Sequence, residues 1–474
     1  MKVEVRGSSL SQAGADMVAV GLCEGEDLPA ELAAAPGAES APYRVGKTTL
    51  LRPPDSPPVL VVGLGRRDEI EPERLRVAAA TAAKEAAGLE ARSLAWQPTE
   101  PGEAAAEALV TGTILASWRF DRFRTPGEEE PPRLQALSLL APDDVVRAAE
   151  AARVCAEAQN RARDLQSTPA NVATPSFLAA RAEEIAAACE SVSVETLGRA
   201  EIEAKGMGGL VAVSQGSAEE PRLIVLRYAG GGSGEKLGLV GKGVTFDTGG
   251  ISLKPGAGMH EMKMDMSGAA AVIEAVAAIA ELGLALELVA IVPSTENMPS
   301  GTAIKPGDVI TQHNGKTVEV NNTDAEGRLI LADALSYAVE LGAERLVDLA
   351  TLTGAVTIAL GSTYAAVISN DDELAAEVLR AGERSGELTW RLPLHPEFKE
   401  LMKGTVADLS NLASKRKAGT ITAASFLEEF VGGMPWAHVD IAGTAWDVGR
   451  EYTGNGASGF GVRLLVELAR HLSA

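Results

Sequence analysis

The stretch GRLILADALSYAVELG (residues 327–342), followed closely by RLVDLATLTG (residues 345–354), decides the fold class of this chain. The first segment is typical of an amphipathic helix, and the second is a short apolar run typical of a buried strand. The same order occurs upstream, in SGAAAVIEAVAAIAELG and then LELVAIVPS (residues 267–294). Helices and strands that alternate in this way predict a largely parallel sheet covered by helices on both faces.

The alternation extends outward from this stretch. RLIVLRYAG (residues 222–230) and KLGLVGKGVTFDTGG (residues 236–250) read as two further strands of the same sheet. Nearer the N-terminus, PPVLVVGLG predicts a strand and ERLRVAAATAAKEAAGL predicts a helix. We therefore expect a smaller α/β domain over residues 1–141, an alanine-rich linking helix over 142–166, and a larger C-terminal α/β domain over 167–474.

Composition limits the classes of partner. The chain has 474 residues and a formal net charge of −22, which argues against general binding to nucleic acid or anionic membranes. Its three cysteines show no paired or zinc-binding spacing, which fits a reducing compartment. No apolar signal segment opens the sequence, and no uncharged apolar run reaches the ~18 residues of a membrane helix. We expect a cytoplasmic protein that does not bind membranes.

NNTDAEGRL (residues 321–329) places two acids and one base at alternate positions. In an extended segment Asp324, Glu326 and Arg328 share one face, and Gly327 argues against a helix interior, so we expect the three to project together from a loop or a strand end. Two neighbouring carboxylates repel each other unless a cation or a proton lies between them. Arg328 would offset one charge, whereas a divalent cation would offset both and favours carboxylate oxygens. A solvated acidic turn is the competing interpretation.

Two other segments place charges among apolar neighbours. Lys242 and Asp247 end an apolar strand, and Asp265 stands just before a helix rich in small residues. Buried charges cost free energy unless they are paired or bound to a ligand. A salt bridge between Lys242 and Asp247 is one ordinary explanation, and an N-cap role for Asp265 or Ser267 is another.

Taken together, the acids of these segments suggest a shared site. Four of them stand near boundaries between strands and loops: Asp247, Asp265, Asp324 and Glu326. If they converge at one edge of the sheet, two divalent metals ~3.5–4 Å apart would satisfy them, as in phosphatases, nucleases and aminopeptidases. There is no HExxH motif, and AVSQG lacks the first glycine of a nucleophile elbow, which disfavours a serine hydrolase. The pattern alone leaves the class of two-metal hydrolase open.

The same segments resemble the M17 leucyl aminopeptidase family, also called cytosol aminopeptidases. NTDAEGRL (residues 322–329) is similar to the signature of that family. The resemblance continues in GKGVTFDTGGISLKP, MKMDMSGAAAV, ENMPSG, DLATLTGA and WAHVDIAGTAW, and it reaches back to ARDLQSTPAN at Ala162. No comparable motif is evident before Ala162. The resemblance implies a two-metal peptidase domain over residues 167–474.

The resemblance also implies a role for each site residue. Asp247 and Glu326 match bridging metal ligands, Asp324 matches a ligand of the more readily exchanged metal, and Lys242 and Asp265 match ligands of the tighter metal. Lys254 and Arg328 match the two catalytic residues that do not bind metal. The positions that match the substrate site are Met262, Asn322, Thr351, Leu352 and Gly354. Two divalent ions are expected in each subunit, either manganese or zinc, with magnesium or cobalt as alternatives. Oxygen-rich ligands favour the harder ions.

The implied reaction removes the N-terminal residue of a peptide, with leucine and similar apolar residues preferred. The free α-amine of the substrate binds one metal and its scissile carbonyl binds the other, which restricts the reaction to chain ends. A water bridging the two metals loses a proton and attacks the carbonyl. Lys254 stabilises the developing oxyanion. A bicarbonate held by Arg328 carries the proton.

Two other functions compete with this one. A DNA-binding role, known for some members of the resembled family, would need a basic strip, and NLASKRKAG (residues 411–419) is the densest basic run. Nucleic acid remains an unlikely partner at this net charge. A two-metal phosphatase or nuclease is the other alternative. The resemblance further implies a homohexamer whose active sites face an interior cavity.

Overall fold

The computed structural model describes residues 1–54, 56–125, 133–232 and 234–473. These fall into two compact units, one formed by 1–160 with 449–454 and the other by 161–448 with 455–474. The alanine-rich helix α3 (Val146–Ser167) runs across the division in sequence. Among the described residues, no helix is long and apolar enough to cross a lipid bilayer.

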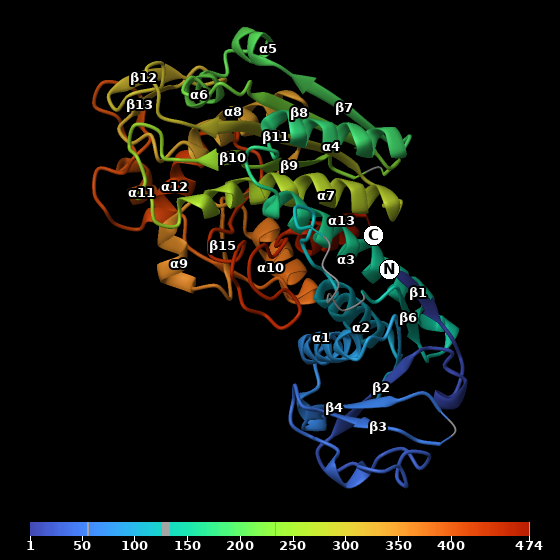
Figure 1. Ribbon diagram of the computed structural model, residues 1–474. Coiled ribbons are helices and arrows are strands. Elements are labelled where there is room, and N and C mark those ends of the chain that lie inside the picture. Colours follow the sequence, from blue (N-terminus) through green and yellow to red (C-terminus); the bar gives the residue numbers. More distant parts are fainter. Residues whose placement is uncertain (55, 126–132, 233, 474) are drawn as a thin grey trace. The chain divides into compact units, whose positions relative to one another are not determined.

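The N-terminal unit is built on a six-stranded sheet (blue in Figure 1). Five of its strands are parallel, and β3 pairs with β4 in the antiparallel sense. In spatial order they are β1 (Lys2–Val5), β6 (Ala136–Leu139), β5 (Ser93–Gln97), β2 (Met17–Cys23), β4 (Val59–Gly65) and β3 (Thr48–Leu51). The helices α1 (Pro72–Gly88) and α2 (Glu103–Ala116) pack against each other, and their alanines are largely buried.

The second unit, the C-terminal unit, contains a larger mixed sheet. Its central strands are parallel, and antiparallel pairs occur between β15 and β18 and at the β8 and β7 edge. In spatial order the strands are β16 (Thr389–Arg391), β15 (Ala365–Ser369), β18 (Trp436–Asp440), β14 (Arg345–Ala350), β9 (Leu237–Gly241), β11 (Glu287–Asn297), β8 (Arg222–Ala229) and β7 (Val192–Leu197). The short strand β10 (Gly243–Asp247) pairs with the end of β11. The expected α/β class with a largely parallel central sheet is confirmed.

Helices cover both faces of this sheet, as Figure 1 shows for α7 and α8. One layer contains α4 (Pro175–Ala188), α7 (Ser267–Glu281), α10 (Asp372–Ser385) and α13 (Val462–Leu472). The other contains α6 (Gly208–Ser214), α8 (Gly327–Glu340) and α12 (Gly419–Leu427). Shorter helices are α5 (Arg199–Ala204), α9 (Gly354–Leu360) and α11 (Pro396–Glu400). Continuous apolar runs in the central strands match burial on both faces.

A small third sheet leads the chain into the acidic segment. It contains β12 (Asp308–Thr311), β13 (Thr317–Val320) and β17 (Leu409–Ser410). The strand β13 ends one residue before Asn321, and α8 begins at Gly327. The acidic segment is therefore a short connection between a strand and a buried helix.

Two glycines allow the helices to approach the ends of the strands. A Cβ added to Gly268, in the first turn of α7, would lie 2.0 Å from the carbonyl oxygen of Leu349 and 2.9 Å from the backbone nitrogen of Lys242. A Cβ added to Gly327 would lie 2.6 Å from Cε of Lys242. A side chain at position 268 would clash with backbone atoms, and one at position 327 would displace the end of Lys242, so these glycines let both helix starts converge on the segment after β9.

Candidate metal centre

The charged residues singled out from the sequence come from several places in the C-terminal unit. Lys242 follows β9, and Asp247 is the last residue of β10. Asp265 lies in a 3-10 turn (Met259–Met266) before α7, and Glu326 is the N-cap residue of α8. These elements end at one edge of the sheet, which is where α/β folds bind ligands.

One end of the cluster is fully buried. The ammonium of Lys242 lies 2.7 Å from Asp265 Oδ2 and 2.9 Å from Glu326 Oε1, and the three side chains are 3, 7 and 3% exposed. Lys242 also donates a hydrogen bond to the carbonyl oxygen of Thr351, and the Thr351 hydroxyl donates to Asp265. We call Lys242, Asp265 and Glu326 the buried end of the site.

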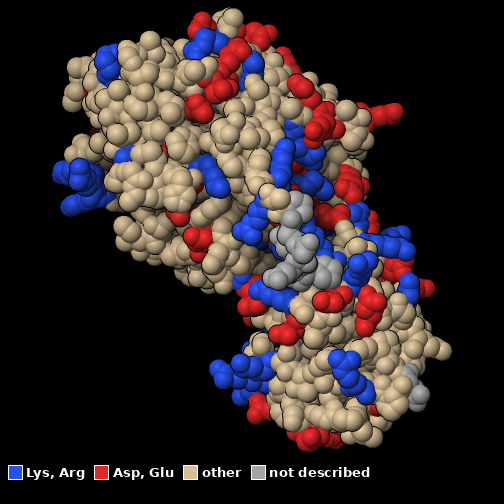
Figure 2. Space-filling view, viewed as in Figure 1, with Lys and Arg blue, Asp and Glu red and all other residues tan. Residues whose placement is uncertain are grey.

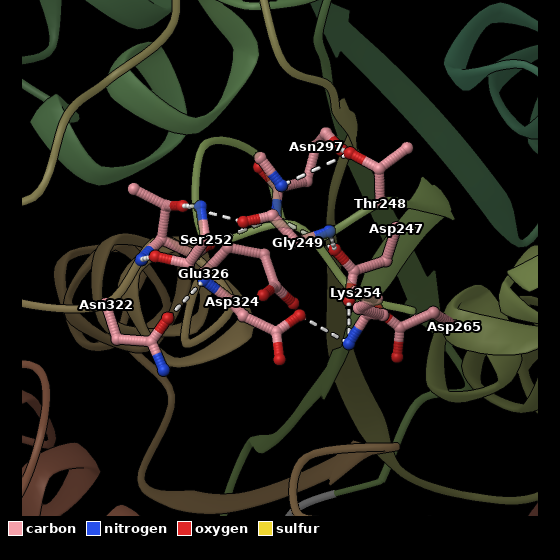
Figure 3. A network of polar contacts seen from close by, with 12 residues as sticks. Asp247, Thr248, Gly249, Ser252, Lys254, Asp265, Asn297, Asn322, Asp324 and Glu326 are labelled. Carbon is pink, nitrogen blue, oxygen red and sulfur yellow. Dashed lines mark hydrogen bonds and ion pairs between the residues drawn. The ribbon is translucent and has the colours of Figure 1, made fainter. Parts of the chain in front are cut away.

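The other end reaches solvent. Lys254 lies 2.8 Å from Asp247 Oδ2 and 2.5 Å from Asp324 Oδ1, and Figure 3 shows Lys254 between these two carboxylates. Lys254 and Asp324 are 24 and 32% exposed, whereas Asp247 is buried. Asp247 also accepts hydrogen bonds from the Asn297 amide and the Gly249 backbone. We call Lys254 and Asp324 the open end, with Asp247 as its buried partner.

The charges of the cluster do not balance. Four carboxylates contact two ammonium groups, and counting the nearby Arg328 guanidinium still leaves one negative charge in excess in a largely buried space. Burial raises the pKa of Asp265 to about 8 and the pKa of Asp247 to about 6. Burial acts in the same direction on Glu326, but Lys242 and Lys254 outweigh it and lower the pKa of that carboxyl. An excess of this kind is satisfied by protons or by cations.

The donor set fits divalent metal ions. Oxygens of Asp247, Asp265 and Glu326 lie within 4.8 Å of one another, and all three residues are buried. Within the described chain, Glu326 Oε2 is buried and has no hydrogen-bond partner. Hard cations favour such carboxylate oxygens, and a cation there would satisfy both the orphaned oxygen and the excess charge.

The substrate positions suggested by the resemblance are mostly brought together. A cavity of about 250 Å³ contains the charged cluster, and Met262, Thr351, Leu352 and Gly354 also line it. Asn322 does not line this cavity. Its side-chain oxygen instead accepts a hydrogen bond from the Asp324 backbone nitrogen, which fixes the turn that carries Asp324.

Arg328 lies beside the cluster without pairing with it. The residue is in the first turn of α8, is buried, and lines the same cavity. One guanidinium nitrogen donates a 2.8 Å hydrogen bond to the carbonyl oxygen of Asn411, and Nε has no hydrogen-bond partner in the described chain. Burial lowers the pKa of Arg328 to about 10, so the group remains a cation at neutral pH.

Three local interpretations from the sequence are wrong. Lys242 pairs with Asp265 and Glu326, while the salt bridge of Asp247 is made with Lys254. Neither Asp265 nor Ser267 caps α7, whose N-cap residue is Met266 without a side-chain hydrogen bond. The acidic segment is not extended throughout, because Glu326 has helical backbone angles and Arg328 is already inside α8.

Sequence reasoning also missed residues that shape the site. The Asn297 amide links Asp247 to the carbonyl oxygen of Thr323. The Asn411 side chain accepts from the Asn321 backbone nitrogen and donates to the Asn322 carbonyl oxygen. Asn297 lies in ENMPSG, which was noted for its family resemblance, and Asn411 begins NLASKRKAG, which was noted for its basic residues. Neither segment indicated that the amide would reach the acidic turn.

The fold and the cluster together define an α/β protein with a carboxylate-rich candidate metal centre. Residues 160–466 match the family model described as the catalytic domain of the cytosol aminopeptidase family, and residues 26–127 match the N-terminal domain of the same family. The chain belongs to the cytosol aminopeptidase family, and it is a metal-dependent aminopeptidase. The N-terminal match corrects the expectation that no family resemblance exists before Ala162.

Curated proteins and a solved structure agree with this assignment. The chain is 50% identical over 426 residues to a probable cytosol aminopeptidase of Syntrophotalea carbinolica, covering 86% of this chain and 85% of that protein. It is 44% identical to one of Roseiflexus castenholzii, covering 99% of both. The structure of the bottromycin maturation enzyme BotP in complex with Mn is 37% identical, with a TM-score of 0.89 and coverage of 97% of this chain and 100% of that one.

Proposed function

We propose that this aminopeptidase removes N-terminal leucine and similar apolar residues from peptides at the centre formed by the buried and open ends. The single observation that carries the proposal is the excess of buried carboxylates around Lys242 and Lys254. When bound, two divalent cations, manganese or zinc with magnesium or cobalt as alternatives, supply Lewis acidity and lower the pKa of water. The solved structure of BotP with Mn supports manganese.

The chain's own residues divide the metal-binding work. Lys242 and Asp265 would hold the tighter ion at the buried end, and Asp324 would hold the exchangeable ion at the open end. Asp247 and Glu326 would be ligands shared by the two ions. A lysine binds a metal ion only as a neutral amine. Burial lowers the pKa of Lys242, but Asp265 and Glu326 outweigh burial and raise it, so the side chain is an ammonium before metal binds. Metal loading therefore requires Lys242 to release a proton.

Lys254 and Arg328 act on the substrate and on the proton. Burial opposes the charge of Lys254, but Asp247 and Glu326 outweigh it and raise the pKa, so the side chain is an ammonium that stabilises the oxyanion of the scissile carbonyl. Arg328 would hold a bicarbonate that carries the proton, and its position in the lining of the metal-centre cavity supports that role. Met262 and Leu352 supply apolar contacts for a leucine-like side chain.

We also propose that the enzyme works in the cytoplasm as a homohexamer. Support comes from the names of the curated relatives and from the family to which the chain belongs. Light scattering of the purified protein would give the mass of the assembly directly.

Metal analysis of the purified enzyme is the decisive experiment. We expect two divalent ions per subunit, loss of leucine p-nitroanilide hydrolysis on chelation, and recovery when Mn²⁺ or Zn²⁺ is returned. p-Nitrophenyl phosphate with Mn²⁺ serves as the control for a phosphatase. Hydrolysis of the phosphate ester without hydrolysis of the anilide would refute the proposal.

A further inference from the structure

A second groove adjoins the cavity of the metal centre. Its volume is about 540 Å³, its apolar lining includes Ala355, Ile358 and Leu412, and the basic residues 415–417 form one side. Arg328 lines both spaces. We call this space the basic groove, and it begins where the metal-centre cavity ends.

The helix α9 also joins the two spaces. Gly354 and Thr357 line the metal-centre cavity, while Ala355 and Ile358 line the basic groove. The two residues of each pair are three positions apart, so they lie on the same face of the helix. The two faces are adjacent, and each borders a different space. Ile358 is 89% exposed, an unusual position for a large apolar side chain.

The loop that carries the basic residues is hydrogen-bonded at both ends to residues around the metal centre. At its start, the Asn411 carbonyl oxygen accepts a hydrogen bond from Arg328, and its side chain binds the acidic turn. At its end, the hydroxyl of Thr420 is 2.9 Å from the hydroxyl of Thr353. The loop is therefore fixed relative to the metal centre.

The three cations on this loop are not neutralised. Lys415, Arg416 and Lys417 are exposed, and within the described residues none of them makes an ion pair. In the view of Figure 2, basic side chains gather at the edge of the C-terminal unit beside α11 and α12. On a chain with a net charge of −22, three adjacent free cations above an apolar surface match a partner that is apolar and negatively charged.

We propose that the basic groove binds the part of the peptide that follows the scissile bond and selects peptides that carry a carboxylate there. This inference rests on the proposed peptidase function. Two or three extended residues span roughly 7–11 Å, so a short peptide cleaved at the metal centre extends into the adjoining space. The carboxylate is either the C-terminus of the peptide or an acidic side chain.

Matched tripeptides test the selection. The probes are Leu-Ala-Ala-amide, Leu-Ala-Ala with a free C-terminus, and Leu-Ala-Asp-amide. We expect the metal-loaded enzyme to have a kcat/KM about 3- to 10-fold higher for the two charged peptides at low salt, the range that a few exposed ion pairs supply, with less preference at high salt. Comparison of the two charged peptides separates a terminal carboxylate from an acidic side chain.

A triple variant with Lys415→Ala, Arg416→Ala and Lys417→Ala should lose this preference and hydrolyse the neutral peptide within about twofold of the unaltered enzyme. The matched control removes three exposed cations that line neither space and make no ion pair within the described residues, with Lys47→Ala, Arg52→Ala and Arg380→Ala. The control should retain the preference. Light scattering of both variants should give an unchanged mass.

Three results would overturn the proposal. An unchanged ratio of charged to neutral peptide in the triple variant would exclude selection by the groove, while hydrolysis itself would leave the peptidase function standing. Dissociation of the assembly in the triple variant alone would assign the groove to a subunit contact. Salt-sensitive binding of duplex DNA, lost in the triple variant without a change in the peptide ratio, would assign the loop to nucleic acid. If no peptide is hydrolysed by any variant, the peptidase proposal also fails.

Discussion

The two ends of the candidate metal centre use the same residue types in opposite surroundings. At the buried end, Lys242 is enclosed by Asp265 and Glu326, and none of the three side chains is more than 7% exposed. At the open end, Lys254 and Asp324 are in contact with each other and with solvent. The site thus contains two groups of a lysine with its carboxylates. One group is closed to solvent, and the other is accessible to it.

The difference in burial assigns different tasks to the two ends. A buried carboxylate that loses its countercharge is costly, so the buried end must always contain protons or metal. Solvent stabilises the charges of the open end, so that end tolerates exchange of ions and arrival of substrate. We therefore expect substitutions at the two ends to separate metal retention from turnover.

The largest effect should follow loss of the bridging acid. Glu326→Ala removes a carboxylate that faces both lysines, and we expect hydrolysis of leucyl substrates to fall below detection while the protein stays folded. Leucine p-nitroanilide assays and circular dichroism measure the two outcomes. Glu340→Ala, on the same helix but outside the cavity, should retain full activity. Substantial activity in the Glu326 variant would remove that residue from the centre.

The next effect should separate the ends. Lys254→Ala removes the accessible ammonium, and we expect kcat to fall by about 10²- to 10³-fold, the loss typical of one oxyanion donor. Metal content should stay near that of the unaltered enzyme because the carboxylate ligands remain. Lys254→Arg keeps the charge and should recover part of the rate. Full turnover in Lys254→Ala would mean that its assigned role is wrong.

Metal exchange should differ between the ends. We expect chelation of the unaltered enzyme to release one ion quickly and the other slowly, because Asp324 is partly exposed and Asp265 is buried. Asp324→Asn should lower the metal affinity of the rapidly exchanging site by at least ~10-fold, because even residues that only support a metal ligand cause losses of that size. The slowly released ion should stay bound. Asp265→Asn should affect the slow ion instead. Loss of both ions together from both variants would contradict two distinct ends.

The smallest effect should come from the apolar wall of the cavity. Met262→Ala should lower kcat/KM for a leucyl substrate by about tenfold, the scale of lost apolar contact in a substrate pocket, and lower it less for an alanyl substrate. Met259→Ala, three residues earlier in the same 3-10 turn and outside the cavity, is the control. Equal losses on both substrates would mean that Met262 serves packing rather than selection.

The sequence predicted the parts of this molecule that depend on local pattern. Long apolar runs predicted the strands β9, β11 and β14 and the helices α7 and α8, because burial on both faces leaves a continuous apolar signal. Charges among apolar neighbours indicated most of the cluster, and the family resemblance added Lys254 and the role of each residue. The fold does bring these side chains together. In the N-terminal unit, alanine-rich helices carry no chemical signature, so the pattern of residues there did not point to the family.

The pairing of charges required the fold itself. Lys242 and Asp247 are five residues apart, yet the turn after β9 directs Lys242 toward Asp265 and Glu326. The contact of Asn411 with the acidic turn joins residues about 90 positions apart, and nothing local to either segment encodes it. Spacing along the chain could therefore suggest a shared site without specifying which partners meet.

The close approach of Gly327 to Lys242 means that the residue at one position limits the residue at the other. The lysine methylenes fill the space that any side chain at position 327 would need. An alanine at position 327 would push the end of the Lys242 side chain away from α8 and disturb its contacts with Asp265 and Glu326. The amine at the sealed side of the centre therefore keeps its position only while residue 327 lacks a side chain.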